Sequence, residues 1–366
     1  MTVYTWLVVL LLVAAVLFHS NQKKNVKYIV VAFLLLFAVM GLRDVNAIGN
    51  DSSGSSGSYP ILYRNVGNTE WGEITGIGEE NYNIGFRYLM KLVYELTGGD
   101  YQFFVTLISL FTLFAYLRFI RKYSSSPLLS VLCFLGLLYY TLLFDVLKQA
   151  IAMAILLFAF DAIMEKKPIR FIFFVALATL FHFPALVFLP AYWVGRMKVG
   201  RNYIILLAVL LLVTYYFRDQ LLNLMLDAYG GDEIDVTMEG IRFLRNKVVI
   251  MIAIVVFSAI IRPPAPEDTL YNALLIFAGI SIIFQTFCGY NNIFERLADY
   301  YFHTSIVFIP LIFERDGKSR MRSIVGIDQR IVNSVPVIIG VVSVWRFLSY
   351  VNNSPIFMPY KFFWQG

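Results

Sequence analysis

The residues of this chain that could do chemistry are charged side chains at the ends of apolar stretches. Arg43 and Asp44 end one such stretch, Lys148 opens another, and His182 lies between two more. An ionisable group in or beside a membrane-spanning helix is costly to bury unless a partner or water compensates its charge. These groups are therefore candidates for binding or catalysis, and the cations among them could hold an anion such as phosphate.

Lys148 is the most informative of these cations. With Asp145 as the predicted N-cap, Lys148 falls in the first turn of a helix, where the backbone dipole is already positive and a cation is unfavourable. A cation at this position is explained if an anion binds at the helix end. The alternative is that Lys148 pairs with Asp145 or extends to the membrane interface.

Three further groups have both a chemical and a structural interpretation. Arg43 could bind an anion, or it could anchor the end of its helix. Arg296 could contact a phosphate, or it could pair with Asp299 three residues later on the same helix face. His182 stands between two phenylalanines, so it could take part in catalysis or be a satisfied core residue.

The composition places these charged groups in a membrane protein. Of the 366 residues, 59% are hydrophobic and 15% are charged, and the mean hydropathy is +0.70. Soluble globular chains carry roughly 25% charged residues. We therefore expect an all-α polytopic membrane protein in which residues 1–366 form a single transmembrane domain.

Apolar runs of about 20 residues cross a bilayer core, and such runs predict 11 to 12 transmembrane helices here. The first run lacks the basic start and the cleavage site of a signal peptide, so we expect it to be retained. Pro184 and Pro190 interrupt the region 168–197, which could be two spans or a re-entrant hairpin. The expected spans cover residues 2–19, 27–43, 101–120, 127–144, 146–164, 168–182, 184–197, 202–217, 247–262, 269–288, 299–314 and 331–349.

Charge indicates the direction of these spans. If the N-terminus lies outside, the inner loops hold 18 of the 30 basic residues and the outer side holds 17 of the 24 acidic residues. Cytoplasmic loops of membrane proteins collect Lys and Arg. We therefore expect both termini to be extracytoplasmic, and the basic pI of 9.1 requires no nucleic-acid partner.

Two outer loops, 44–100 and 218–246, are too long to be simple turns, and we expect them to carry part of the site. In the first loop, apolar residues between Asn81 and Leu96, Leu92 among them, stand near helical spacing and predict an amphipathic helix on the outer surface. A similar helix is expected around Leu221 to Leu226.

Five segments of the chain follow one another in an order that is typical of a known family. They are Arg43 leading to Ile48-Gly49-Asn50-Asp51, then Glu79-Glu80-Asn81-Tyr82-Asn83-Ile84-Gly85-Phe86, then Leu147-Lys148-Gln149-Ala150-Ile151-Ala152, then Phe181-His182-Phe183-Pro184-Ala185-Leu186, and finally Arg296-Leu297-Ala298-Asp299-Tyr300-Tyr301-Phe302. Together they resemble the EpsG family of bacterial exopolysaccharide polymerases, which are related in function to the Wzy polymerases of O-antigen. The chain departs from the family where Lys148 replaces the usual arginine, because lysine lacks the bidentate fork of a guanidinium.

The resemblance implies a GT-C-like membrane glycosyltransferase of the bacterial inner membrane. Such an enzyme polymerises polyprenyl-diphosphate-linked oligosaccharides for exopolysaccharide, capsule or O-antigen synthesis, and we expect neither a cofactor nor a metal ion. A chain-length regulator and a flippase are candidate partners besides the lipid bilayer. The residues that the resemblance implicates are Arg43, Lys148, Gln149 and Arg296 for the diphosphate, Asp51, Glu80 and His182 for catalysis, and Asp299 and Tyr301 in support.

Two other functions fit a multispanning chain with clustered charges. A polyprenyl-linked glycan flippase or other transporter should show related halves and polar residues through the midplane, and neither is clear in the sequence. A membrane O-acyltransferase of surface glycan would need inner access to an acyl donor and more catalytic groups than His182.

Overall fold

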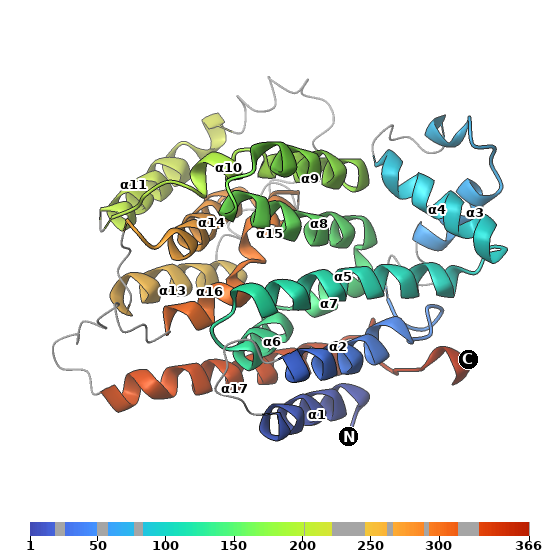
Figure 1. Ribbon diagram of the computed structural model, residues 1–366, viewed down its shortest axis with the longest axis horizontal. Helices are drawn as coiled ribbons and strands as arrows, with labels where there is room; N and C mark the ends of the chain where they lie inside the picture. Colours follow the sequence, from blue (N-terminus) through green and yellow to red (C-terminus); the bar gives the residue numbers. More distant parts are fainter. Residues whose placement is uncertain are drawn as a thin grey trace. The chain divides into compact units, whose positions relative to one another are not determined.

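The computed structural model describes residues 1–18, 26–49, 58–76, 83–200, 202–221, 246–261, 266–288, 293–313 and 329–365. Figure 1 shows them as helices and their connections. By their contacts they form two compact units. Unit 1 comprises Met1–Asp161, Ile169–Leu186 and Asn333–Gly366, and unit 2 comprises Ala162–Pro168 and Val187–Val332. This part of the chain is helical, and its one isolated β-bridge joins Arg43 to Phe362.

Every predicted span falls on a helix or on two consecutive helices, which confirms the all-α polytopic fold. The helices that lie wholly or mainly in unit 1 are α1 (Val3–Leu17), α2 (Val26–Gly41), α5 (Tyr101–Tyr123), α6 (Pro127–Gly136), α7 (Tyr139–Asp145), α8 (Leu147–Met164), α9 (Pro168–Phe181) and α17 (Gln329–Asn353). Those of unit 2 are α10 (Ala191–Val194), α11 (Tyr203–Tyr216), α13 (Asn246–Ile261), α14 (Thr269–Gln285), α15 (Ile293–Phe302) and α16 (Ser305–Ile312).

Three of the described helices are each long and apolar enough to cross a bilayer, namely Tyr101–Tyr123, Leu147–Met164 and Ser334–Asn353. The pair α6 and α7 makes a fourth candidate, bent by 54°. Leu138 lies in the left-handed region at this bend, with a φ of 66°. The other predicted spans correspond to apolar helices or helical pieces that are individually shorter than the roughly 20 residues of a full span.

The predicted span 299–314 is divided. The segment 299–314 was expected to be one helix, but α15 ends at Phe302 and α16 begins at Ser305. The Thr304 hydroxyl donates to the carbonyl of Tyr301 (2.8 Å) at the break. Arg296 and Asp299 therefore lie on a short helix of their own.

Both chain ends lie at the same end of unit 1. The Thr2 hydroxyl donates to the side-chain oxygen of Asn352 (2.9 Å), so the start of α1 lies beside the end of α17. The Tyr4 ring packs edge-on against Phe357 and Tyr360, with ring centres 6.3 and 5.5 Å away. Two ends on the same side of a membrane require an even number of spans between them, so this arrangement agrees with the predicted topology. Which side of the membrane they lie on stays a prediction.

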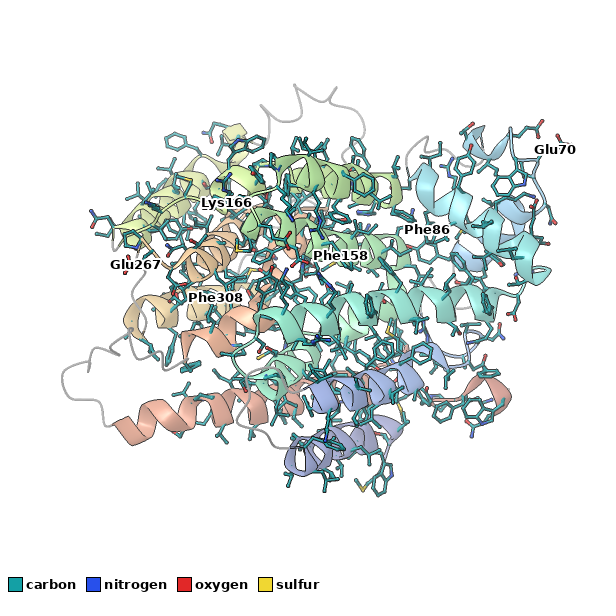
Figure 2. The ribbon with its side chains drawn as sticks, viewed as in Figure 1. Glu70, Phe86, Phe158, Lys166, Glu267 and Phe308 are labelled. Atoms are coloured by element: carbon teal, nitrogen blue, oxygen red, sulfur yellow. The ribbon has the colours of Figure 1, made fainter. Side chains whose placement is uncertain are left out.

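The described part of the segment 44–100 is folded, and we keep for it the name outer loop from the predicted topology. It contains α3 (Ser58–Gly67), the 3-10 turn η1 (Ile74–Gly76) and α4 (Ile84–Thr97). The Tyr59 ring of α3 packs against Phe86 of α4, with ring centres 5.5 Å apart; Phe86 is labelled in Figure 2. This contact joins the two helices of the loop.

The helix predicted between Asn81 and Leu96 is confirmed as α4. Leu92 is 47% exposed and Leu96 is 76% exposed. The buried side instead carries Phe86, Met90 and Val93, which follow one another at helical spacings of four and three. The helix predicted around Leu221 to Leu226 falls largely on residues 222–245, which lie outside the described part of the chain.

A polar contact also fixes α4 against α3. The Lys91 ammonium donates to the carbonyl of Gly67 (2.9 Å) and pairs with Glu95 (2.9 Å), and the Trp71 indole donates to Glu95 (3.0 Å). The hydrogen bond from Lys91, with a second from Trp71, holds the pKa of the exposed Glu95 carboxyl below its ordinary value. These contacts give the outer loop a defined shape beside the helix ends that carry the predicted site.

Candidate functional site

Arg43 follows α2 directly and is completely buried. Its Nη1 donates to the carbonyl of Met40 (2.6 Å), and its Nη2 donates to the carbonyl of Phe144 (2.7 Å). Its guanidinium carbon lies 4.6 Å from the centre of the Phe144 ring. Both carbonyls belong to the last turn of a helix, where a cation is favoured by the helix dipole. Arg43 therefore ties the end of α2 to the end of α7.

The C-terminal tail pairs with the backbone on either side of Arg43. The amide of Asp44 donates to the carbonyl of Lys361 (2.9 Å), and the amide of Phe363 donates to the carbonyl of Leu42 (3.1 Å). We did not predict this pairing from the sequence, because almost the whole chain separates the two segments. The aromatic run from Phe357 to Trp364 is the signal that could have indicated a docked tail.

Replacing Arg43 with lysine should lower the free energy of unfolding by about 2 kcal/mol, the value of one charge-assisted hydrogen bond. A single ammonium cannot reach both helix ends as the guanidinium fork does. Chemical denaturation of the purified protein measures the change. Arg64→Lys is the matched control, because Arg64 is exposed on α3. Equal stability of Arg43→Lys and the wild type would contradict the role that we give to this contact.

The structure places Lys148 in the first turn of α8, as predicted, because this helix begins at Leu147. The N-cap prediction is wrong by one residue. Asp145 is the last residue of α7, and Val146 lies between the two helices, with its carbonyl accepting from the amide of Ala150 (2.8 Å). The non-helical backbone of Val146, with φ −86° and ψ 67°, thus shifts the cap position by one residue.

An aromatic ring from the outer loop lies near Lys148. The Lys148 ammonium nitrogen is 5.9 Å from the centre of the Tyr59 ring of α3. A cation over an aromatic face gains roughly 0.5–1 kcal/mol at an exposed site. Gln149, the next residue of the motif, is buried at 2% exposure. The positive end of α8 and the folded outer loop therefore meet at Lys148.

His182 lies directly after α9 in unit 1 and is 7% exposed. The amide of the next residue, Phe183, donates to the side-chain oxygen of Asn83 (2.9 Å). Gly85 approaches Leu180 so closely that an added Cβ would lie 3.0 Å from the Cβ of Leu180. Asn83 and Gly85 belong to the motif that also holds Glu80, so the structure brings that motif and the His182 motif together. We did not predict this positioning role of Asn83.

In unit 2, Arg296 is exposed on α15, whereas Asp299 on the same helix is 3% exposed. The Asp299 carboxylate pairs with the ammonium of Lys247 at 2.5 Å, and Glu295 lies 3.5 Å from the same ammonium. Lys247 stands at the start of α13. No spacing in the sequence indicates this partner, because Lys247 and Asp299 lie on helices that are distant along the chain.

Tyr301 links α15 to a preceding segment of unit 2. Its hydroxyl donates to the carbonyl of Val187 (2.7 Å). Its ring packs against Phe188 and Phe277, with ring centres 5.1 and 5.3 Å away. Tyr301 is 2% exposed, so its contacts support the packing of α15.

The predicted site residues are thus distributed over both units. Arg43, Lys148, Gln149 and His182 lie in unit 1, and Arg296, Asp299 and Tyr301 lie in unit 2. Asp51 and Glu80 lie outside the described residues. Their roles, like the diphosphate site as a whole, stay predictions.

Comparison with known proteins supports the resemblance of the five motifs. The chain matches the sequence model of the EpsG family over residues 26–362, which is nearly its whole length. No curated protein and no solved structure matches it. The match includes all five motifs, and the apolar helices agree with a protein of the membrane. The chain therefore belongs to the EpsG family, a family of membrane-bound exopolysaccharide polymerases.

Proposed function

We propose that the chain joins polyprenyl-diphosphate-linked oligosaccharides into polysaccharide at the outer face of the bacterial inner membrane. The bond between the anomeric carbon of the donor sugar and the diphosphate oxygen breaks, and the diphosphate leaves with the electron pair. The acceptor hydroxyl oxygen forms the new glycosidic bond and loses its proton to a base. The donor carries its own leaving group, so the reaction needs no nucleotide sugar.

The position of Lys148 is the observation that carries this proposal. A cation in the first turn of α8 opposes the helix dipole at a cost of about 0.3–1 kcal/mol. A bound diphosphate reverses that cost, because the helix end and the ammonium then attract the same anion. Negative charge on the diphosphate grows as the glycosidic bond breaks, so a fixed cation stabilises the transition state more than the bound substrate.

The remaining predicted residues, apart from Arg43, keep the roles that the family resemblance implies. Gln149, next to Lys148, is the further diphosphate ligand of the proposal in unit 1. The exposed Arg296 lies in unit 2, and its role stays a prediction. Both terminal nitrogens of Arg43 donate hydrogen bonds to backbone carbonyls. We therefore assign Arg43 first to holding the end of α7, directly before the start of α8. Asp51, Glu80 and His182 remain the candidates for the base that accepts the proton of the acceptor hydroxyl.

A reconstituted assay tests the proposal. The purified full-length protein in lipid vesicles, supplied with polyprenyl-diphosphate-linked repeat units, should give a ladder of products that grow by whole units and should release polyprenyl diphosphate. Transfer of an acyl group from acyl-CoA to the glycan, with no ladder, would favour an O-acyltransferase. Movement of the intact lipid-linked unit between leaflets, with no ladder, would favour a transporter.

A further inference from the structure

A groove of about 510 Å³ lies between α2 and α5 in unit 1, at the helix ends opposite to Arg43 and Lys148. Its apolar wall consists of Ile29, Val30 and Phe33 from the start of α2, with Phe114 and Leu117 from the second half of α5. This volume lies within the range of pockets that bind small ligands. Val30 is 50% exposed and Phe114 is 53% exposed, so the described residues leave this wall uncovered.

Three basic side chains complete the lining of the groove. They are Arg118, Arg121 and Lys122, all in the last two turns of α5. Arg118 also lies over the ring of Phe158, with its guanidinium carbon 4.6 Å from the ring centre; Phe158 is labelled on α8 in Figure 2. One end of an apolar groove is therefore strongly positive.

A single carboxylate holds two of these cations at the edge of the groove. Asp161 of α8 has no exposed surface, and it accepts hydrogen bonds from Arg118 Nη2, from the Lys122 ammonium (2.9 Å) and from the Tyr123 hydroxyl (2.6 Å). The side chains of Arg118 and Lys122 nevertheless remain 29% and 36% exposed. One negative charge fixes two of the three cations, so this cluster keeps a positive balance.

Arg121 is the least constrained of the three cations. Its side chain is exposed, and it makes no hydrogen bond or ion pair with the part of the chain that the structure describes. A guanidinium in this state can offer two parallel N–H groups to a phosphate. The groove thus combines a preformed cationic rim with an uncovered apolar wall.

We propose that this groove binds an anionic phospholipid of the adjoining membrane leaflet. The phosphate lies among Arg118, Arg121 and Lys122, and an acyl chain lies along the wall formed by α2 and α5. Basic pockets between transmembrane helices recognise anionic lipid headgroups in this way. A zwitterionic lipid should bind more weakly, because its own ammonium would lie near the three cations. A phosphate without acyl chains should also bind more weakly, because it would leave the apolar wall uncovered. The site does not depend on the polymerase reaction, because it uses other residues and the other helix ends.

Native mass spectrometry of the full-length protein in detergent tests this proposal with phosphatidylglycerol, phosphatidylcholine and glycerol 3-phosphate as probes. Phosphatidylglycerol should bind at least fivefold more tightly than either of the other two. Equal binding of phosphatidylglycerol and phosphatidylcholine would overturn the role of the basic rim. Equal binding of glycerol 3-phosphate would overturn the role of the apolar wall.

Two variants locate the lipid without disturbing the Asp161 contacts. Arg121→Gln removes one cation and should weaken phosphatidylglycerol binding about fivefold, whereas Lys198→Gln removes an exposed cation of unit 2 and should not. Val30→Trp fills the groove and should weaken binding, whereas Val16→Trp, on the exposed end of α1, should not. If each control lowers binding as much as its partner variant, the lipid does not bind in this groove.

Discussion

Replacing Lys148 with alanine is expected to lower the rate of polymer formation about 100-fold, the loss typical of removing one preorganised group that stabilises developing charge. The proposal places this ammonium beside the departing diphosphate, where its attraction grows during bond breaking. The loss should therefore fall on kcat more than on KM, because binding of the intact donor involves less charge at that oxygen. Product ladders from the reconstituted protein, followed over time and over donor concentration, give both quantities.

Two further variants separate charge from folding at Lys148. Lys148→Arg should keep most of the activity, because a guanidinium preserves the cation. Lys361→Ala is the matched control, since Lys361 is an exposed lysine of unit 1 in the tail beside Arg43. Full activity of a well-folded Lys148→Ala protein would remove the main support for a diphosphate site at α8.

The helices could be predicted from the sequence because hydropathy is a local property. Long apolar runs bounded by charge located the apolar helices, including the start of α8, which places Lys148 in a first turn. The break between α15 and α16 was missed because the apolar run continues through it. Apolar spacing located α4, but it does not tell which apolar residues pack inward, because Val93 is buried whereas Leu92 and Leu96 are exposed.

Contacts between distant segments could not be predicted in the same way. The pairing of Arg43 with Phe362 depends on how α2, α7 and the C-terminal tail pack, and no spacing in the sequence records that packing. The same holds for Asn83, whose side chain is fixed to the His182 segment across a hundred residues. The sequence thus identified chemically interesting residues, but it could not separate those that bind substrate from those that hold helices together.

The groove between α2 and α5 contains residues whose proposed binding role could not be predicted from the sequence. In the sequence, Arg118, Arg121 and Lys122 indicate only which side of the membrane their loop occupies, because cytoplasmic loops are rich in Lys and Arg. Only the placement of Asp161 beside them, from a helix that follows much later, reveals that two of the three are held in a fixed geometry. A cation that is both oriented and partly exposed is a better candidate for binding than one that merely flanks a span.

Replacing Lys247 with methionine should destabilise the protein by about 3–5 kcal/mol, the cost of leaving a buried carboxylate without its counterion. The Asp299 side chain is 4% exposed and lies 2.5 Å from the Lys247 ammonium, so water cannot readily replace this partner. Asp299→Asn should lower the stability less than Lys247→Met does. The Lys247 side chain is 18% exposed and Glu295 lies 3.5 Å from its ammonium, so Lys247 keeps water and a carboxylate as partners. Chemical denaturation of the purified variants measures both changes.

The double variant Lys247→Met/Asp299→Asn distinguishes a purely structural role of this ion pair from a role of Asp299 in the reaction. It should recover much of the stability that Lys247→Met loses, because no charge is then buried alone. If Asp299 serves only to pair with Lys247, the folded double variant should polymerise at close to the wild-type rate. If Asp299 also has a part in the reaction, the folded double variant should be stable but slow. Unchanged stability of Lys247→Met alone would show that the ion pair does not hold α13 and α15 together.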